Sequence, residues 1–328
     1  MAKASRSDTH AHSRHRVPTG DGWPITLHAY GDPHDTRVPV LLCHGACSNH
    51  RIYDLGGGFG LAPYLSRDGR RVFCVDLRGR GESFPSDRAK ALLVRGWTMD
   101  DLLVHDLPAA IAHVLRTTGA EQLDYVGHSM GGLLILAHLA ATGDERVRRV
   151  VSVGSSDFGS MEEARTDPSV RQVDLSKVLA PAFLTLPIVP VGPFARGLSR
   201  VQSLVPEGLP NPGWNAANVE PVHMARYLRE GLVSVSSRKF RVFRGLPSPD
   251  ALARYRHPTF WLAGKKDGLI EPRVVKRCHD RAASSEKRYQ LFARSTGYRA
   301  DYGHSDLLIG RHAPIEVFPE IEGFLERA

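Results

Sequence analysis

A serine at the centre of a short glycine-bounded motif is the first candidate for chemistry in this sequence. The pentapeptide Gly-His-Ser-Met-Gly at 127–131 follows the predicted strand 122–126 and precedes the predicted helix 133–141. A serine between a strand and a helix lies on a tight, strained turn that exposes its hydroxyl, and the flanking glycines leave room for neighbouring backbone. The positive end of the following helix favours a developing oxyanion. The pattern therefore predicts Ser129 as a nucleophile.

A serine hydroxyl is a weak nucleophile without a general base and an acid that orients the base. Asp267 comes shortly after the predicted strand 259–263, and His304 lies in the loop that follows the last predicted strand. When the nucleophile lies on a strand-to-helix turn, the acid comes next in the chain and the histidine comes last. We therefore predict His304 as the base and Asp267 as the acid. Asp157, which follows an earlier apolar strand, remains an alternative acid.

Backbone N–H groups are needed to bind the negative oxygen of the reaction intermediate. One predicted donor is Met130, directly after the nucleophile. The second is Ala46, in the loop after the predicted strand 38–43, and the neighbouring Cys47 is the alternative. His44 has a side chain that could act as a base, but one histidine is sufficient, so we assign it a structural role.

The segments that must position these residues alternate between strand and helix patterns. Strands are predicted at 23–30, 38–43, 71–76, 122–126, 147–153, 259–263 and 287–292. Helices are predicted at 61–67, after a cap formed by Thr98 and Asp101, at 133–141, 221–231 and 315–326. This alternation predicts an α/β fold, with a mostly parallel, doubly wound sheet covered by helices on both faces.

The strand and helix rhythm is interrupted once, and this defines the predicted organisation. Residues 155–255 are irregular and rich in proline, and we interpret them as a lid inserted into a core formed by 17–154 and 256–328. Residues 1–16 are basic and rich in histidine, as expected for a flexible tail. Within the lid, the apolar stretch 180–194 could wall a pocket for a hydrophobic substrate.

Composition excludes several other classes of protein. The 328 residues carry a formal charge of +8, but the basic residues are interspersed with acidic ones, so no nucleic-acid partner is expected. The four cysteines lack zinc-ligand or redox spacing, and we expect no metal and no cofactor. The N-terminal segment lacks the apolar core of a secretory signal, and the longest apolar stretch is short and broken by prolines. We therefore expect a cytoplasmic protein without stable membrane insertion; its oligomeric state is not predicted.

Taken together, these motifs resemble those of the α/β-hydrolase superfamily over almost the whole chain after the tail. The segment 76–83, Asp-Leu-Arg-Gly-Arg-Gly-Glu-Ser, and the His-Gly pair at 44–45 contribute to this resemblance. A weaker similarity links 41–49 and 302–308 to the acid lipases. The Met-Gly-Gly sequence at 130–132 is instead similar to that of monoacylglycerol lipases and many bacterial esterases.

The resemblance implies a serine hydrolase that cleaves a carboxylic ester of a moderately hydrophobic small molecule through an acyl-enzyme on Ser129, with water as the acceptor. The same residues could act on thioesters, lactones, amides or carbon–carbon bonds, or transfer an acyl group, because these reactions share the nucleophile, the base and the oxyanion hole. A non-catalytic binding protein with this fold would be expected to lack a member of the triad, and none is missing here.

Overall fold

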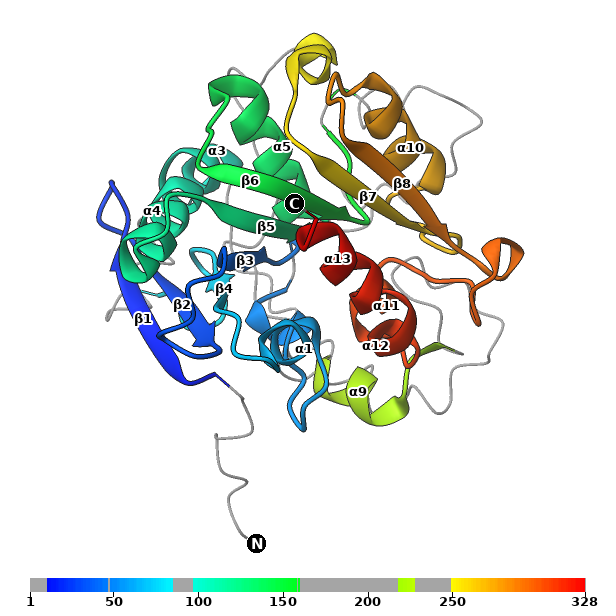
Figure 1. Ribbon diagram of the computed structural model, residues 1–328, viewed down its shortest axis with the longest axis horizontal. Coiled ribbons are helices and arrows are strands. Elements are labelled where there is room, and N and C mark those ends of the chain that lie inside the picture. The colour runs from blue at the N-terminus through cyan, green and yellow to red at the C-terminus, as the bar shows by residue number, and fades with distance from the viewer. Residues whose placement is uncertain are drawn as a thin grey trace, which may run out of the picture.

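One sheet of eight strands forms the centre of the protein (Figure 1). The computed structural model describes residues 11–46, 48–84, 97–157, 159, 218–227 and 249–327. In chain order the strands are β1 (Ser13–Pro18), β2 (Pro24–Tyr30), β3 (Val40–Cys43), β4 (Val72–Asp76), β5 (Leu123–His128), β6 (Val147–Val153), β7 (Thr259–Gly264) and β8 (Lys287–Phe292). Their spatial order is β1-β2-β4-β3-β5-β6-β7-β8. The pairs β1–β2 and β2–β4 are antiparallel, and all later pairs are parallel, which confirms the mostly parallel sheet.

The central strands are apolar on both faces, which requires a covering layer on each side. In β3, Leu41 and Cys43 belong to one hydrophobic core, whereas Val40 and Leu42 belong to the other. All four side chains are fully buried. The continuous apolar run that the sequence shows at this strand therefore reflects two cores separated by the sheet.

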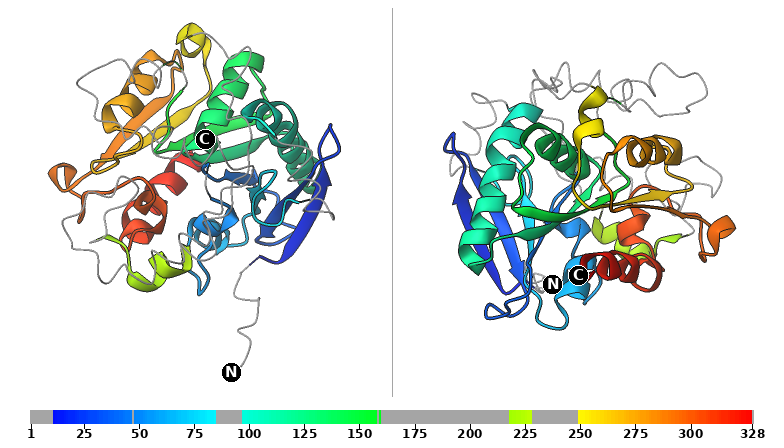
Figure 2. Two further views of the ribbon diagram at one scale, coloured as in Figure 1. Left: turned by 180° about the vertical axis from the view of Figure 1, so that it is seen from behind. Right: turned by 45° about the horizontal axis from the view of Figure 1, so that its top comes forward.

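Helices cover both faces of the sheet, as predicted (Figure 2). The helices α4 (Leu107–Thr118), α5 (Met130–Thr142) and α10 (Pro272–Arg281) pack over one face and contribute to the first core. The helices α1 (Leu61–Ser66) and α13 (Phe318–Leu325) pack over the other face, together with the short helices α11 (Asp306–Ile309) and α12 (Ala313–Glu316). The helix α10 was not among the predicted elements.

The region before α4 is less regular than the predicted amphipathic helix. Thr98 caps α3 (Met99–Asp101), and Asp101 returns the contact to the Thr98 backbone, which confirms the predicted cap. Residues 102–106 then form a π-helical segment before α4 begins. Pro108, in the first turn of α4, has no N–H to donate to the preceding turn, which accounts for the change in helical form at this point.

The predicted start of the core needs correction. The strand β1 begins at Ser13, so the prediction of a flexible tail through Arg16 is wrong for its last residues, which pair with β2 at the sheet edge. At the other end of the predicted lid, Leu252 in the 3₁₀ turn Pro249–Arg254 is buried in the first core, so this part of the predicted lid packs on the core.

Most of the predicted lid, including the apolar stretch 180–194, lies outside the described residues. One described part is α9 (Pro221–Arg226), which lies beside α1 and α12 (Figure 1). Its Arg226 donates to the carbonyl of Leu55. The ring centroids of His223 and Phe59 are 3.8 Å apart. None of the helices in the described ranges has the length and apolar character needed to cross a membrane.

Candidate active site

Ser129 lies on the turn between β5 and α5, as the motif predicts. Its φ of 52° and ψ of −118° make it the one non-glycine residue with positive φ in the described part of the chain. Its N–H donates to the carbonyl of Val153 at 2.9 Å. Its carbonyl accepts from the Ser155 hydroxyl at 2.6 Å and from the N–H of Leu133 at 3.1 Å. The backbone of Ser129 is thus held from β6 and from α5, which maintains a conformation that an ordinary residue rarely adopts.

The glycines of the motif permit the close approach of three backbone segments at this turn. A Cβ atom on Gly131 would lie 2.2 Å from the carbonyl oxygen of Cys43 in β3, and one on Gly127 would lie 2.5 Å from the nitrogen of Gly132. Neither distance is possible without movement of the backbone. These glycines are therefore required by packing, in agreement with the sequence argument.

His304 and Asp267, which are 37 residues apart in the chain, meet in a buried contact. His304 Nδ1 lies 2.8 Å from Asp267 Oδ2, and the two residues are only 4% and 3% exposed. The other carboxylate oxygen of Asp267 accepts from the N–H groups of Leu269 and Ile270 at 2.9 and 2.8 Å. The carboxylate is thereby fixed by its own loop, with one oxygen directed at the imidazole.

His128, the residue before the nucleophile, connects the turn to the loop of His304. Its Nε2 donates to the backbone carbonyl of His304 at 3.1 Å, and the two ring centroids are 4.6 Å apart. Burial, followed by the neighbouring His304, lowers the pKa of His128 well below its ordinary value, so the ring is neutral. This contact was not predicted from the sequence. The only signal was the position of His128 inside the motif, which says nothing about a partner far along the chain.

The loop after β3 lies against the nucleophile. A Cβ atom on Gly45 would lie 3.1 Å from the Cβ of Ser129. Ala46 follows in the same loop, and Met130 is the first residue of α5. The structure therefore brings both predicted oxyanion donors to segments that adjoin Ser129.

His44 has both ring nitrogens engaged with backbone. Its Nδ1 donates to the carbonyl of Gly45 at 2.8 Å, and its Nε2 accepts from the N–H of Leu77 at 3.2 Å. Burial lowers the pKa of His44 to about 4, so the ring is neutral, as these contacts require. This arrangement agrees with the structural role expected for His44.

The alternative acid Asp157 contacts a different partner from the one expected of a triad acid. The thiol of Cys278 in α10 donates to Asp157 Oδ1 at 3.1 Å, and the N–H of Asp157 lies 3.3 Å from the same sulfur. His304 Nδ1 is already engaged by Asp267. The geometry therefore favours Asp267 over Asp157.

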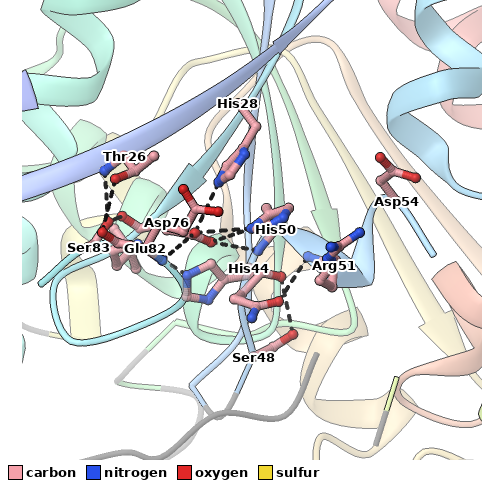
Figure 3. A network of polar contacts seen from close by, with 12 residues as sticks. Thr26, His28, His44, Ser48, His50, Arg51, Asp54, Asp76, Glu82 and Ser83 are labelled. Carbon is pink, nitrogen blue, oxygen red and sulfur yellow. Dashed lines mark hydrogen bonds and ion pairs between the residues drawn. The ribbon is translucent and has the colours of Figure 1, made fainter. Parts of the chain in front are cut away.

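One buried cluster has the side chains of a metal site but the geometry of a hydrogen-bonded network (Figure 3). His28 Nε2 and His50 Nδ1 lie 3.1 and 3.0 Å from the carboxylate of Asp76. The two rings are stacked, with centroids 3.6 Å apart and planes only 23° from parallel. Nitrogen lone pairs in nearly parallel planes cannot both point at one ion, whereas both rings can bond to the same carboxylate. These residues therefore do not fit a shared metal ion.

The family to which the chain belongs follows from comparison with known proteins. Residues 38–297 match the family described as alpha/beta hydrolase fold, and the chain belongs to this family. The matched range includes Ser129 and Asp267 and ends before His304. The placement of His304 therefore depends on its order in the chain and on the contact with Asp267.

The individual proteins that this chain resembles share only a small fraction of its sequence. A triacylglycerol lipase from Pseudarthrobacter phenanthrenivorans is 27% identical over 159 residues, which are 46% of this chain and 44% of that protein. The chain thus spans less than half the length of the curated relatives it matches. A monoacylglycerol lipase of Paleococcus ferrophilus aligns with a TM-score of 0.58 and 17% identity over 92% of this chain and 98% of that one. An esterase from Exiguobacterium antarcticum aligns with a TM-score of 0.57 and 16% identity over 95% and 99%. At such identities the structural likenesses show the fold alone.

Proposed function

We propose that this protein is a serine hydrolase that cleaves the carboxylic ester of a moderately hydrophobic substrate through an acyl-enzyme on Ser129. The observation that carries the proposal is the buried 2.8 Å contact between His304 Nδ1 and Asp267 Oδ2, linked through His128 to the turn that bears Ser129. The description of distant relatives as triacylglycerol lipases supports ester hydrolysis as the reaction.

The proposed mechanism gives the two nitrogens of His304 different roles: Nδ1 holds the ring in place and Nε2 transfers the proton. Because Nδ1 faces the Asp267 carboxylate, Nδ1 carries the ring proton and Nε2 is left to accept the proton of the Ser129 hydroxyl. The Ser129 oxygen attacks the acyl carbon, and the N–H groups of Met130 and Ala46 bind the oxyanion. His304 then protonates the leaving alcohol, and a water molecule, deprotonated by the same nitrogen, releases the acid.

The first experiment is hydrolysis of p-nitrophenyl esters from acetate to palmitate by the wild type and by Ser129→Ala. We expect the variant to lose the activity, and the preferred chain length to report the size of the acyl pocket. The matched control is Ser152→Ala, because Ser152 is a fully buried serine in β6 whose hydroxyl has no hydrogen-bond partner among the residues that the structure describes. Equal activity of Ser129→Ala and the wild type would contradict the proposal.

A labelling experiment tests the nucleophile without assuming a substrate. A fluorophosphonate probe reacts with an activated serine, and mass spectrometry should locate the adduct on Ser129. Labelling of Ser129 without hydrolysis of any nitrophenyl ester would support Ser129 as the nucleophile. The substrates to test next would then be thioesters, lactones and acyl acceptors. The absence of both labelling and hydrolysis would exclude the proposed function.

The identity of the triad acid has its own matched pair of variants. Asp267→Asn should lower kcat by about 10⁴-fold, because the amide no longer holds the imidazole in the required tautomer. Asp157→Asn should leave kcat within about two-fold of the wild type, because Asp157 contacts Cys278. The reverse order of effects would assign the acid role to Asp157.

A further inference from the structure

The loop that carries Ala46 is held by the turn that follows β4. The loop 44–50 and the turn 76–82 share three sets of contacts: Leu77 N–H to His44 Nε2, His50 N–H and Nδ1 to the Asp76 carboxylate, and the Arg80 guanidinium to the Ala46 carbonyl. Figure 3 shows the contacts around Asp76. Its two neighbouring histidines keep the pKa of the Asp76 carboxyl well below its usual range although burial raises it, so this anchor is ionised. The loop is therefore fixed at its start, near its middle and at its end.

Of these contacts, the one made by Arg80 involves the predicted oxyanion donor, Ala46, itself. Its Nε and Nη2 donate to the Ala46 carbonyl at 3.0 and 2.9 Å, and its Nη1 donates to the carbonyl of Arg78 at 3.0 Å. The residue is only 1% exposed. Two donors from one planar guanidinium fix both the position and the direction of the carbonyl they share, which a single ammonium donor does less well.

The same residue brings a positive charge to this part of the site. Arginine remains protonated under all ordinary conditions, and charges act more strongly in a buried environment than in water. The charge also acts on a neighbour: burial lowers the pKa of His44, and Arg80 adds to this effect. A cation bound to the Ala46 carbonyl would also favour negative charge on an oxygen bound at the N–H of Ala46.

The Ala46 carbonyl and the Ala46 N–H belong to successive peptide groups joined at the Ala46 Cα. We propose that Arg80 is a positioning residue for the oxyanion hole: by binding the carbonyl it restrains the residue whose N–H is the predicted donor, and its charge adds a favourable potential for the anionic intermediate. This inference rests on the proposed function, because it requires Ala46 to bind the oxyanion. Arg80 is too deeply buried to serve as a substrate ligand, and its effect on the reaction passes through Ala46. The effect should therefore appear in transition-state stabilisation and not in substrate binding.

Three substitutions separate the contributions of Arg80. Arg80→Met removes the charge and the donors, Arg80→Lys retains the charge with a single point donor, and Arg80→Gln retains an amide donor without charge. For p-nitrophenyl butyrate, we expect Arg80→Met to lower kcat by about 10- to 100-fold with KM within about two-fold, which is less than the loss of a direct donor. A boronic acid that forms a tetrahedral adduct should bind more weakly by the same factor. Arg80→Lys and Arg80→Gln should fall between Arg80→Met and the wild type.

The matched control is Arg71→Met. Arg71 is also buried and donates to a backbone carbonyl, that of Thr117 at the end of α4, at 3.1 Å. Its loss should alter stability without changing kcat. A loss of kcat as large as that of Arg80→Met would show that general destabilisation explains both results, and would overturn the inference.

The outcomes distinguish this inference from the proposed function. A wild type that neither hydrolyses the esters nor reacts with fluorophosphonate would remove the proposed function itself. An active wild type with unchanged kcat in Arg80→Met, or with a loss confined to KM, would overturn only the role of Arg80. If circular dichroism shows that Arg80→Met does not fold, Arg80→Lys and Arg80→Gln decide: kcat equal to the wild type in both would overturn the inference.

Discussion

At the scale of single residues, Ser129 combines the proposed chemistry with an unfavourable backbone conformation. A positive φ at a residue with a side chain costs about 1–3 kcal/mol, and surrounding contacts must compensate. Here these contacts come from Val153 at the end of β6, from Ser155 just after that strand and from Leu133 in α5. The conformation that exposes the hydroxyl is thus maintained by neighbours that have no part in the chemistry.

This strain can be measured as a difference between two inactive variants. Ser129→Gly should be more stable than Ser129→Ala by about 1 kcal/mol, because glycine adopts positive φ without strain and this gain exceeds its greater loss of chain entropy. Urea denaturation at pH 7 measures the free energy of unfolding of both. An alanine variant as stable as the glycine variant would mean that the turn is not strained.

The buried neutral histidine His44 predicts how stability depends on pH. Its pKa is lowered from an ordinary value of 6.5 to about 4, chiefly by burial, with Asp76 opposing and Arg80 and His50 adding to the shift. The unfolded chain therefore binds a proton that the folded protein does not, so stability falls as pH is lowered from 6.5 to about 4. The loss from this residue is on the order of 3 kcal/mol.

The variant His44→Gln supplies the comparison, since glutamine retains an acceptor and a donor and does not titrate. The free energy of unfolding should fall less steeply between pH 6.5 and 4 in this variant than in the wild type. His128 is also buried and neutral, and it should account for part of the slope that remains. Identical slopes in the two proteins would exclude His44 as a source of the pH dependence.

At the scale of elements, the accuracy of the sequence predictions depended on burial. The strand β3 is fully buried and appears in the sequence as a continuous apolar run, and the mostly buried β6 contains four valines among its seven residues; both were predicted. The strand β1 was missed because it lies at the sheet edge and most of its side chains are polar and exposed. The helix α10 was missed because only Val274, Val275 and Cys278 among its residues are buried, within a highly charged segment.

The candidate site was predictable in so far as it depends on order along the chain. The motif around Ser129 and the positions of Asp267 and His304 after later strands were sufficient to propose their roles. The supporting contacts of His128 and Arg80 were not predictable, because each joins a side chain to a carbonyl on a loop far away in the chain. Such contacts leave no periodic or local pattern in a single sequence.

The close packing of Gly131 in α5 against the backbone of β3 leads to a prediction at the level of elements. Gly131→Ala should lower the free energy of unfolding by about 3 kcal/mol or more, since its Cβ would lie 2.2 Å from the Cys43 carbonyl and backbone must move. Gly323→Ala in α13 is the matched control, because a Cβ there meets no atom within 4 Å and alanine favours the helix by about 1 kcal/mol. Urea denaturation should therefore show opposite signs. A neutral Gly131→Ala would contradict the packing argument.

At the scale of the whole molecule, the carboxyl ends of the parallel strands carry the candidate site, and the amino end of β5 carries a buried network of ion pairs. The carboxyl ends carry Ser129 and Asp267, in the position where sites of open α/β sheets gather. At the opposite end of β5, the fully buried Asp124 binds Arg70 at 2.7 Å and Arg148 at 2.9 and 2.7 Å. Arg148 also donates to the carbonyl of Leu325 at 2.7 Å. This network joins the sheet to the last helix, α13.

Asp124→Asn tests whether this end of the sheet contributes stability without contributing to catalysis. The substitution leaves two arginines without their shared counter-charge, and the free energy of unfolding should fall by about 3 kcal/mol. Asp35→Asn is the control, because the Asp35–Arg37 pair lies near the surface and its loss should cost less than about 1 kcal/mol. For the folded fraction of Asp124→Asn, kcat towards p-nitrophenyl esters at 25 °C should stay within about two-fold of the wild type, because distant sites act nearly independently. A loss of kcat that accompanies the loss of stability would instead show that the network and the turn of Ser129 are coupled through β5.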